Sequence, residues 1–339
     1  MQKRSFLLLA GATTVLVAAA LYALAIGDRA VRPVTRDQRA FPELAARLDD
    51  LAWMRLTRGA LKVDLNLVAG RWAVIERGNY PAAPDTVRRL LLGLAGLVLV
   101  EPKTERPELF GRLDLDDPSN GRSTLVELQD RTGKILAELV VGKTSRGRLG
   151  GGDDAVYVRR PGENRTWLGR GSLDLPADVA GWLDRRILDI PASRIASVRL
   201  RGGDGTVLVL QREAAGGKFA VADAPADANF KDDAALAAPA RALAGLDLAD
   251  VRPSAELPVP ANGVATASFT TFDGLRVDAR LLAHGNADWV ALDASGSGAA
   301  EADAAALGTR LARWTYAIPA ERARLLRTRL ADLVEPKKG

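Results

Sequence analysis

The sequence predicts an α+β fold, in which an N-terminal transmembrane helix precedes two similar modules of antiparallel sheet with packed helices. Three observations lead to this prediction. An uncharged run extends from Phe6 to Ile26, apolar and polar residues alternate along much of the remaining chain, and short motifs recur in the same order about 145 residues apart. Runs of alternating strands with few intervening helices disfavour a doubly wound parallel sheet.

The apolar run at 6–26 predicts a membrane anchor. Lys3 and Arg4 precede it, and as a helix it is long enough to cross a hydrocarbon core of about 30 Å. The run also fits a cleaved secretory signal, with Ala23 and Ala25 at the small-residue positions that signal peptidase prefers. We expect a single-pass membrane protein, with residues 1–5 in the cytoplasm, membrane lipid around the helix and the body outside the cytoplasm.

Composition excludes several classes of chemistry. The 339 residues include no Cys, so the chain has no disulfides, thiolate metal sites or Cys nucleophiles. The single His284 excludes a multi-His metal site. The net charge of +5 is spread along the chain, and no basic block alternates with aromatic residues, so we expect no nucleic-acid partner.

The first half of the body predicts a linker at 27–48 that ends in a short helix at 42–48, followed by a first module at 49–185. Pro84 and Asp85 open a helix whose apolar residues recur at steps of three and four. A second helix is expected near Pro176, carrying Val179 and Trp182. The alternation predicts strands at 51–57, 61–67, 71–76, 124–129, 134–141, 156–158 and 166–168.

The second half repeats this order and predicts a second module at 186–318. A drifting spacing between matched motifs is typical of a duplicated unit separated by loops of different length. Pro239 interrupts the helix expected in the second copy. The C-terminal region, 319–339, predicts a helix that begins at Pro319. The matched motifs are Leu51–Leu56 with Ile195–Leu200, Trp72–Val74 with Phe219–Val221, and Leu94–Leu97 with Leu243–Leu246.

These features resemble a bacterial family of unknown function, DUF4340. The likeness covers roughly residues 50–330 and is carried by four stretches. It is sharpest from Phe110-Gly111 to Leu115-Asp116-Asp117-Pro118, and it continues through Val141-Gly142-Lys143, Val156-Tyr157-Val158, and Trp182 to Leu188. Here Arg112-Leu113-Asp114 intervenes in the first stretch, where the family tends to continue directly. The resemblance implies an auxiliary component anchored in the bacterial inner membrane, with its body in the periplasm. It implies that this component accompanies ABC exporters of the gliding-motility type, with an ABC permease and ATPase as partners. It carries no catalytic residues.

Several short patterns could carry chemistry, but each has a simpler interpretation. Gly142-Lys143-Thr144 looks like the end of a phosphate-binding loop, yet it follows a predicted strand and Ala137 replaces the first glycine. Asp116, Asn120, Gly121 and Glu127 have calcium-loop spacing, but Pro118 takes a ligand position. A turn in which Asp and Asn satisfy local backbone amides explains the same residues.

Three further patterns also have bland explanations. The position of His284 before Gly285-Asn286 is typical of a solvated hairpin tip. The composition of the loop Gly147–Gly152 favours a flexible hairpin tip over an anion nest. Leu326, Leu330 and Leu333 lie on one side of the expected C-terminal helix, which indicates a helix that docks on the body. Arg324 and Arg327 lie on its other side, where we expect solvent; the alternative is contact with anionic lipid. We therefore assign no catalytic, cofactor-binding or metal-ligating residue and expect no cofactor.

Three functions remain open. The first is a non-enzymatic envelope protein that scaffolds or assists an ABC-type exporter through the sheet faces and edges of its tandem modules. The second is a periplasmic module that binds a lipid or glycan in a pocket between the modules, lined by Trp72, Trp167 or Trp289. The third is a hydrolase in which His284 or two carboxylates converge in a cleft.

Overall fold

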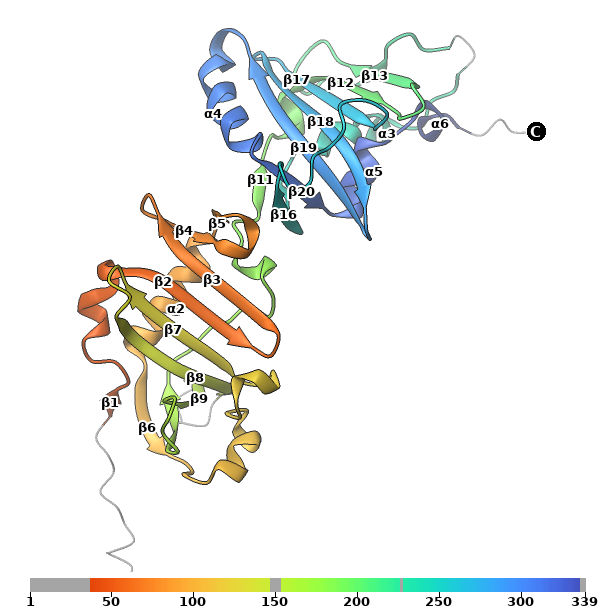
Figure 1. Cartoon of the computed structure of the whole chain (residues 1–339). Helices are drawn as coiled ribbons and strands as arrows, with labels where there is room; N and C mark the ends of the chain where they lie inside the picture. The colour runs from red at the N-terminus through yellow and green to blue at the C-terminus, as the bar shows by residue number, and fades with distance from the viewer. Residues whose placement is uncertain (1–36, 147–153, 226–227, 336–339) are drawn as a thin grey trace, which may run out of the picture. The chain divides into compact units, whose positions relative to one another are not determined.

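The computed structural model describes residues 37–146, 154–225 and 228–335 (Figure 1). The chain divides into two compact units, and the second is discontinuous in sequence. Unit 1 comprises the described residues up to Lys62 and those from Arg88 to Leu175, and unit 2 comprises Val63–Val87 together with the described residues from Pro176 onward. The module boundaries expected from the sequence, 49–185 and 186–318, stay a prediction.

The first sheet has ten strands in the order β1-β6-β10-β9-β8-β7-β2-β3-β4-β5. The expected strands at 51–57, 61–67, 124–129 and 134–141 are confirmed; the first three have ends shifted by one residue at most, and the fourth extends five residues further. The strands are β1 (Gln38–Arg39), β2 (Leu51–Arg58), β3 (Leu61–Val68), β4 (Arg71–Val74), β5 (Tyr80–Pro81), β6 (Val98–Pro102), β7 (Thr124–Asp130), β8 (Ile135–Arg146), β9 (Asp154–Arg159) and β10 (Thr166–Arg170).

The second sheet has eight strands in the order β14-β13-β12-β17-β18-β19-β20-β16 and lies in unit 2. Its strands are β12 (Ile195–Arg201), β13 (Val207–Gln211), β14 (Ala220–Val221), β16 (Asp250–Pro253), β17 (Thr266–Thr271), β18 (Leu275–His284), β19 (Ala287–Gly296) and β20 (Trp314–Ile318). A separate antiparallel pair is formed by β11 (Arg186–Leu188) and β15 (Leu246–Asp247).

The helices of the described residues are few and mostly short. Only α2 (Pro84–Gly96) and α4 (Glu301–Leu311) exceed two turns, and α4 lies along β19 in Figure 1. The others are α3 (Asp233–Ala237), α5 (Ala320–Leu326) and α6 (Leu330–Leu333). Eight 3-10 segments complete the described elements: η1 (Leu44–Asp50), η2 (Ile75–Arg77), η3 (Pro107–Leu113), η4 (Pro118–Asn120), η5 (Ala180–Trp182), η6 (Ala192–Arg194), η7 (Pro239–Arg241) and η8 (Gly298–Ala300).

The predicted fold class, α+β with an N-terminal transmembrane helix and two modules of sheet with packed helices, is wrong. The described chain is mostly antiparallel sheet with few helices, and none of its helices is long and apolar enough to cross a membrane. The predicted anchor at 6–26 lies outside the described residues. The helices expected at 42–48 and near Pro176 are the 3-10 segments η1 and η5.

The two sheets share one strand order. Eight strands of the first sheet run β6-β10-β9-β8-β7-β2-β3-β4, and adding ten to each number gives the second sheet read from its other end. The irregularities recur as well. In the first sheet the register of β2 against β7 shifts between Leu51 and Trp53, and in the second the register of β12 against β17 shifts between Ile195 and Ser197. The two sheets thus share a bulge near the start of matched strands as well as their strand order.

Pro239 explains why α2 has only a broken counterpart. Asp232 caps α3 by accepting a hydrogen bond from the amide of Ala235 at 2.9 Å, but α3 ends at Ala237. Pro239 then occupies the first turn of η7. Proline has no amide hydrogen and its ring clashes with the preceding helical turn, so the helix cannot continue through it. The interruption expected from the sequence is confirmed.

An aromatic corner joins the two sequence segments of unit 2. The ring of Tyr80 on β5 meets Trp314 edge-on at 5.0 Å and Tyr316 at 6.3 Å. Its hydroxyl donates a hydrogen bond to the carbonyl of Asp184 at 3.2 Å. Next to this corner, the Nε atom of Arg77 lies 2.6 Å from a carboxylate oxygen of Asp250. Edge-on aromatic pairs stabilise by about 1 kcal/mol beyond their buried area, so this corner fastens Val63–Val87 into unit 2.

Burial raises the pKa of Tyr316, so we expect the stability of the protein to fall at alkaline pH. Because its folded-state pKa lies above the unfolded value of about 10, the stabilising contribution is present below about pH 10 and declines as the pH rises further. We expect Tyr316→Phe to lose less stability than the unchanged protein between pH 8 and pH 11, as measured by urea unfolding. Equal losses in the two proteins would contradict this account.

Candidate functional site

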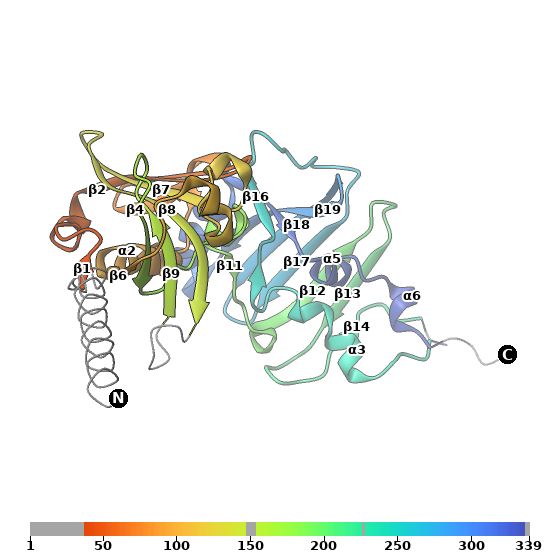
Figure 2. The ribbon, with the colours of Figure 1, turned by 90° about the horizontal axis from the view of Figure 1, so that it is seen from below.

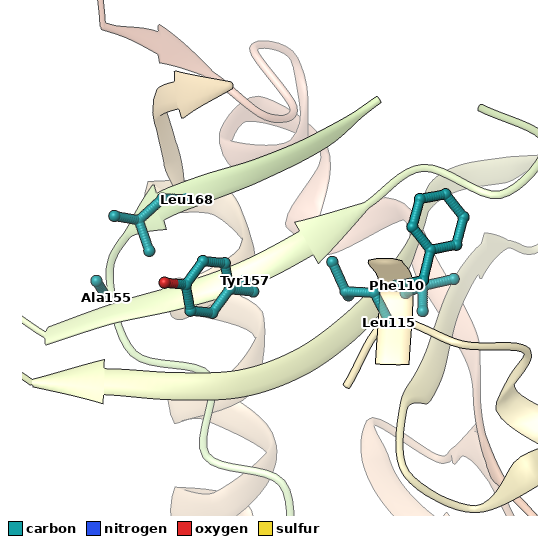
Figure 3. Packing of buried hydrophobic residues seen from close by; sticks show 6 residues of the cluster. Phe110, Leu115, Ala155, Tyr157 and Leu168 are labelled. Atoms are coloured by element: carbon teal, nitrogen blue, oxygen red, sulfur yellow. The ribbon is translucent and has the colours of Figure 1, made fainter. Parts of the chain in front are cut away.

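The connector between β6 and β7 covers one face of the first sheet, which we call the outer face. Phe110 and Leu115 of this connector are buried against Tyr157 of β9 and Leu168 of β10. In Figure 3 Tyr157 lies in the middle, with Phe110 and Leu115 on one side of it and Leu168 on the opposite side. With Val140 and Ala155 these residues form one apolar cluster, which we call the signature cluster because it unites two of the four stretches that carry the family resemblance, those at 110–118 and 156–158.

Gly142 allows the connector to pass this close to β8. A Cβ atom at Gly142 would collide with the carbonyl oxygen of Leu113 and lie 2.8 Å from that of Asp114. The ammonium group of the neighbouring Lys143 donates a hydrogen bond to the carbonyl of Arg112, and its nitrogen lies 5.9 Å from the ring centre of Tyr157. Gly142 and Lys143 therefore hold the connector on the sheet, and they do not form a phosphate loop.

Arg159 completes the attachment from the next strand. Its guanidinium lies 4.8 Å from the ring centre of Phe110, and its Nε donates to the carbonyl of Leu115 at 3.4 Å. Burial lowers the pKa of Arg159, with the nearby charge of Asp117 acting in the opposite direction. A guanidinium over an aromatic face stabilises by about 0.5–1 kcal/mol at such partly exposed sites.

Replacing Gly142 tests whether this close passage matters. Gly142→Ala forces the connector carbonyls away from β8, so we expect a loss of about 2–3 kcal/mol in the free energy of unfolding. Gly96→Ala is the matched control, because a Cβ atom at Gly96 meets nothing within 4 Å. Denaturant unfolding of both variants checks this, and equal stabilities would show that the connector shifts without cost.

The rest of the outer face is polar and carries an aromatic side chain. Trp53 on β2 is half-buried, and the guanidinium of Arg55 lies 4.3 Å from its ring centre. Arg55 pairs in register with Glu127 of β7, which in turn pairs with Glu138 of β8. We call Trp53, Arg55, Glu127 and Glu138 the docking face. Gln129 donates a hydrogen bond to the Glu127 carboxylate, and burial together with the charge of Glu127 raises the pKa of Glu138.

Because Glu127 and Glu138 face each other, we expect the removal of the Glu138 charge to raise the stability of the protein by an amount that depends on pH. The folded-state pKa of Glu138 is raised, so its charged form costs stability at pH 7, and that cost disappears below about pH 4. Like charges directly opposite on a sheet cost about 0.2–1 kcal/mol. We expect Glu138→Gln to raise Tm by about 1–3 °C at pH 7 and to change it little at pH 4.

Thermal unfolding at the two pH values checks this prediction. The control is Glu213→Gln, since Glu213 is exposed in the connection after β13 and faces no paired carboxylate in the sheet registers described. A Glu138→Gln gain that is the same at both pH values would point to a packing effect instead.

The second sheet has a smaller version of the signature cluster. Trp289 of β19 pairs with Ala317 of β20, as Tyr157 of β9 pairs with Leu168 of β10. Leu257, from the connector between β16 and β17, is buried against Trp289. In this cluster the connector contributes one leucine, where the connector of the first sheet contributes Phe110 and Leu115.

The other patterns singled out in the sequence are dispersed in the structure. Asp117, rather than Asp116, accepts a hydrogen bond from the Ser119 amide and caps η4. Glu127 lies in β7 and faces Glu138, so the calcium-loop spacing does not form a loop. Among the described residues, no three His, Asp or Glu side chains are grouped as a metal would need. His284 is the exposed last residue of β18, and its carbonyl accepts from the Trp289 indole at 3.3 Å.

The expected tail helix is in fact two short helices, α5 and α6. Leu326 and Leu333 are buried, and Arg327 binds Asp288 at 2.6 Å, so the segment docks on unit 2. The loop at 147–152 lies outside the described residues. Trp72 and Trp167 are half-buried and Trp289 is buried, and none of the three lines the cavities described within the units.

The sequence pattern did not predict that the carboxylates of Glu127 and Glu138 face each other. Their pairing depends on the register of β7 and β8, which shifts between Leu128 and Gln129. The hairpin turn at Arg131-Thr132-Gly133 was visible, but the shift was not. A register count from that turn could have suggested the pair only if the irregularity had been known.

Comparison with known proteins gives one match. The family model described as a domain of unknown function, DUF4340, matches residues 72–265, which is more than half of the chain. This range contains the whole signature cluster. No curated protein and no solved structure matches the chain.

Proposed function

Since the chain belongs to the DUF4340 family, we propose that it is a non-enzymatic auxiliary or scaffold component of an ABC-type transport system in the cell envelope. The resemblance described above supplies the partner class, an ABC permease with its ATPase. The docking face of the first sheet supplies the attachment site. The proposal concerns protein–protein contact and assigns no chemical step to the chain.

The observation that carries the proposal is the Trp53–Arg55 stack on the outer face. Tryptophan and arginine are the residue types most enriched where protein interfaces gain their binding energy. The stack is held on a strand in the middle of the first sheet, with the docking-face glutamates beside it. Burial and, to a smaller extent, the charge of Glu127 raise the pKa of Glu138, and a cationic partner side chain would relieve the repulsion between the two glutamates.

The edges of the two sheets are less suited to docking than their faces. In the described residues, the outermost strands β1, β5 and β14 are each two residues long, and β16 has four residues and ends in Pro253. Very short edge strands and proline prevent another chain from adding a strand. We therefore place the partner contact on a sheet face.

Affinity purification tests this proposal. The tagged, full-length protein is isolated from detergent-solubilised cells and its partners are identified by mass spectrometry. We expect an ABC permease and its ATPase to be recovered with the unchanged protein, and at least tenfold less with the double variant Trp53→Ala/Arg55→Ala. Loss of a central aromatic–arginine pair typically costs an interface 2 kcal/mol or more.

The control is the double variant Arg165→Ala/Trp167→Ala, which removes a similar pair at the start of β10, where the guanidinium of Arg165, the residue before the strand, lies 6.0 Å from the ring centre of Trp167. It should recover the partners normally. Recovery of no transporter subunit with the unchanged protein would overturn the proposal. Equal recovery with the docking-face variant would reject this face, and unfolding curves of both variants would establish that they are folded.

A further inference from the structure

The C-terminal segment forms an arch over one end of the second sheet. Leu326 at the end of α5 and Leu333 in α6 are both buried. Beyond them, Val334 pairs with Phe230, and the amide of Lys231 donates to the carbonyl of Leu333 at 2.8 Å. The residues between these two fixed points, 327–331, pass the end of the β12–β13 hairpin, and Figure 2 shows α6 beside β13 and α3.

A cavity of about 290 Å³ lies between the arch and the hairpin. Its lining includes Leu200 and Leu208 from the hairpin and Leu326 from α5, which are 3%, 4% and 1% exposed. Ala265 and Leu330 extend this apolar surface. The volume is near the lower end of the range for small-molecule sites, and an apolar lining of this kind favours a hydrocarbon group over water.

The polar residues of the lining are mainly cationic. Arg327 binds Asp288 at 2.6 Å, and Arg329 lies 3.4 Å from a carboxylate oxygen of Asp204. Hydrogen bonds from Thr206, with a smaller contribution from the charge of Arg329, lower the pKa of Asp204, so this aspartate is anionic at neutral pH.

Arg201 is the third arginine of the lining. It is exposed at the end of β12, and the described residues supply it with no ion pair or side-chain hydrogen bond. The lining therefore presents one positive charge beyond those that its aspartate neighbours neutralise. An apolar cavity with a single uncompensated arginine suits a ligand that has a hydrocarbon chain and one anionic group.

We propose that this cavity binds an anionic amphiphile, with the hydrocarbon chain against Leu200, Leu208 and Leu326 and the carboxylate or phosphate on Arg201. The binding is independent of the docking face, because the cavity lies wholly within unit 2 and the docking face within unit 1. The inference therefore goes beyond the proposed scaffold role, and neither depends on the other.

Calorimetric titration of the full-length protein tests both parts of the ligand. Octanoate and octyl phosphate share the chain and differ in the head group, whereas octanol lacks the charge and acetate lacks the chain. We expect octanoate, octyl phosphate or both to bind at least tenfold more tightly than octanol and acetate. Octanol binding as tightly as the anions would overturn head-group recognition, and acetate binding as tightly would reduce the site to an anion site.

Arg201→Gln should weaken binding of the anionic amphiphile at least tenfold and leave the weak binding of octanol unchanged. The matched control is Arg199→Gln, because Arg199 is exposed two residues earlier on β12 and does not line the cavity. An equal loss in both variants would indicate a general effect of surface charge and overturn the assignment. No binding of either anion at millimolar concentration would overturn it as well.

A readout that needs no variant locates the ligand. Methyl NMR signals of Leu200, Leu208 and Leu326 should shift on addition of octanoate, while that of Leu257, which lies in the other apolar cluster of unit 2, should not. Shifts confined to leucines outside the cavity would overturn the proposal. Failure of the transporter pull-down would leave these titrations unaffected, so the two proposals fail separately.

Discussion

The close passage of the connector over Gly142 is the constraint on which the first sheet depends. Strand β9 is buried on both faces, since Ala155, Val156, Tyr157 and Val158 are all at most 1% exposed. An antiparallel sheet normally leaves one face to water. Here the second face is covered by the chain between β6 and β7, and that chain can approach only where β8 lacks a side chain. A conformationally irregular segment thus completes an apolar core.

The two sheets use the same strand order but cover corresponding places differently. At the end of the β2–β3 hairpin, the amide of Gly59 donates to the carbonyl of Pro118 at 2.6 Å, so η4 of the connector lies against the turn. At the corresponding end of β12–β13, the neighbour is the C-terminal arch. The two sheets share the strand order and the bulge near the start of β2 and β12, whereas their covering segments differ. The cavity lies where one of these divergent covers spans the sheet.

Local patterns predicted the strands well because one face of each strand packs against a core. The alternation in Leu51–Arg58 and Leu61–Val68 and the turn at Arg58-Gly59 placed β2 and β3 closely. Helix content was overestimated because Pro176 and the apolar residues after it form only the single turn η5. The facing glutamates and the cavity could not be predicted, since the first depends on a register shift and the second on the approach of α5 to a distant hairpin.

The aromatic corner of unit 2 can form only late in synthesis of the chain. Tyr80 is synthesised about 230 residues before Trp314 and Tyr316, against which it packs. At translation rates of roughly 5–20 residues per second, the ring waits roughly 10 to 50 s for its partners. The Tyr80 ring therefore lacks these partners while most of the chain is still being made. Ribosome-bound chains that stop before β20 would leave this ring open to chaperones, and completion of β20 would cover it.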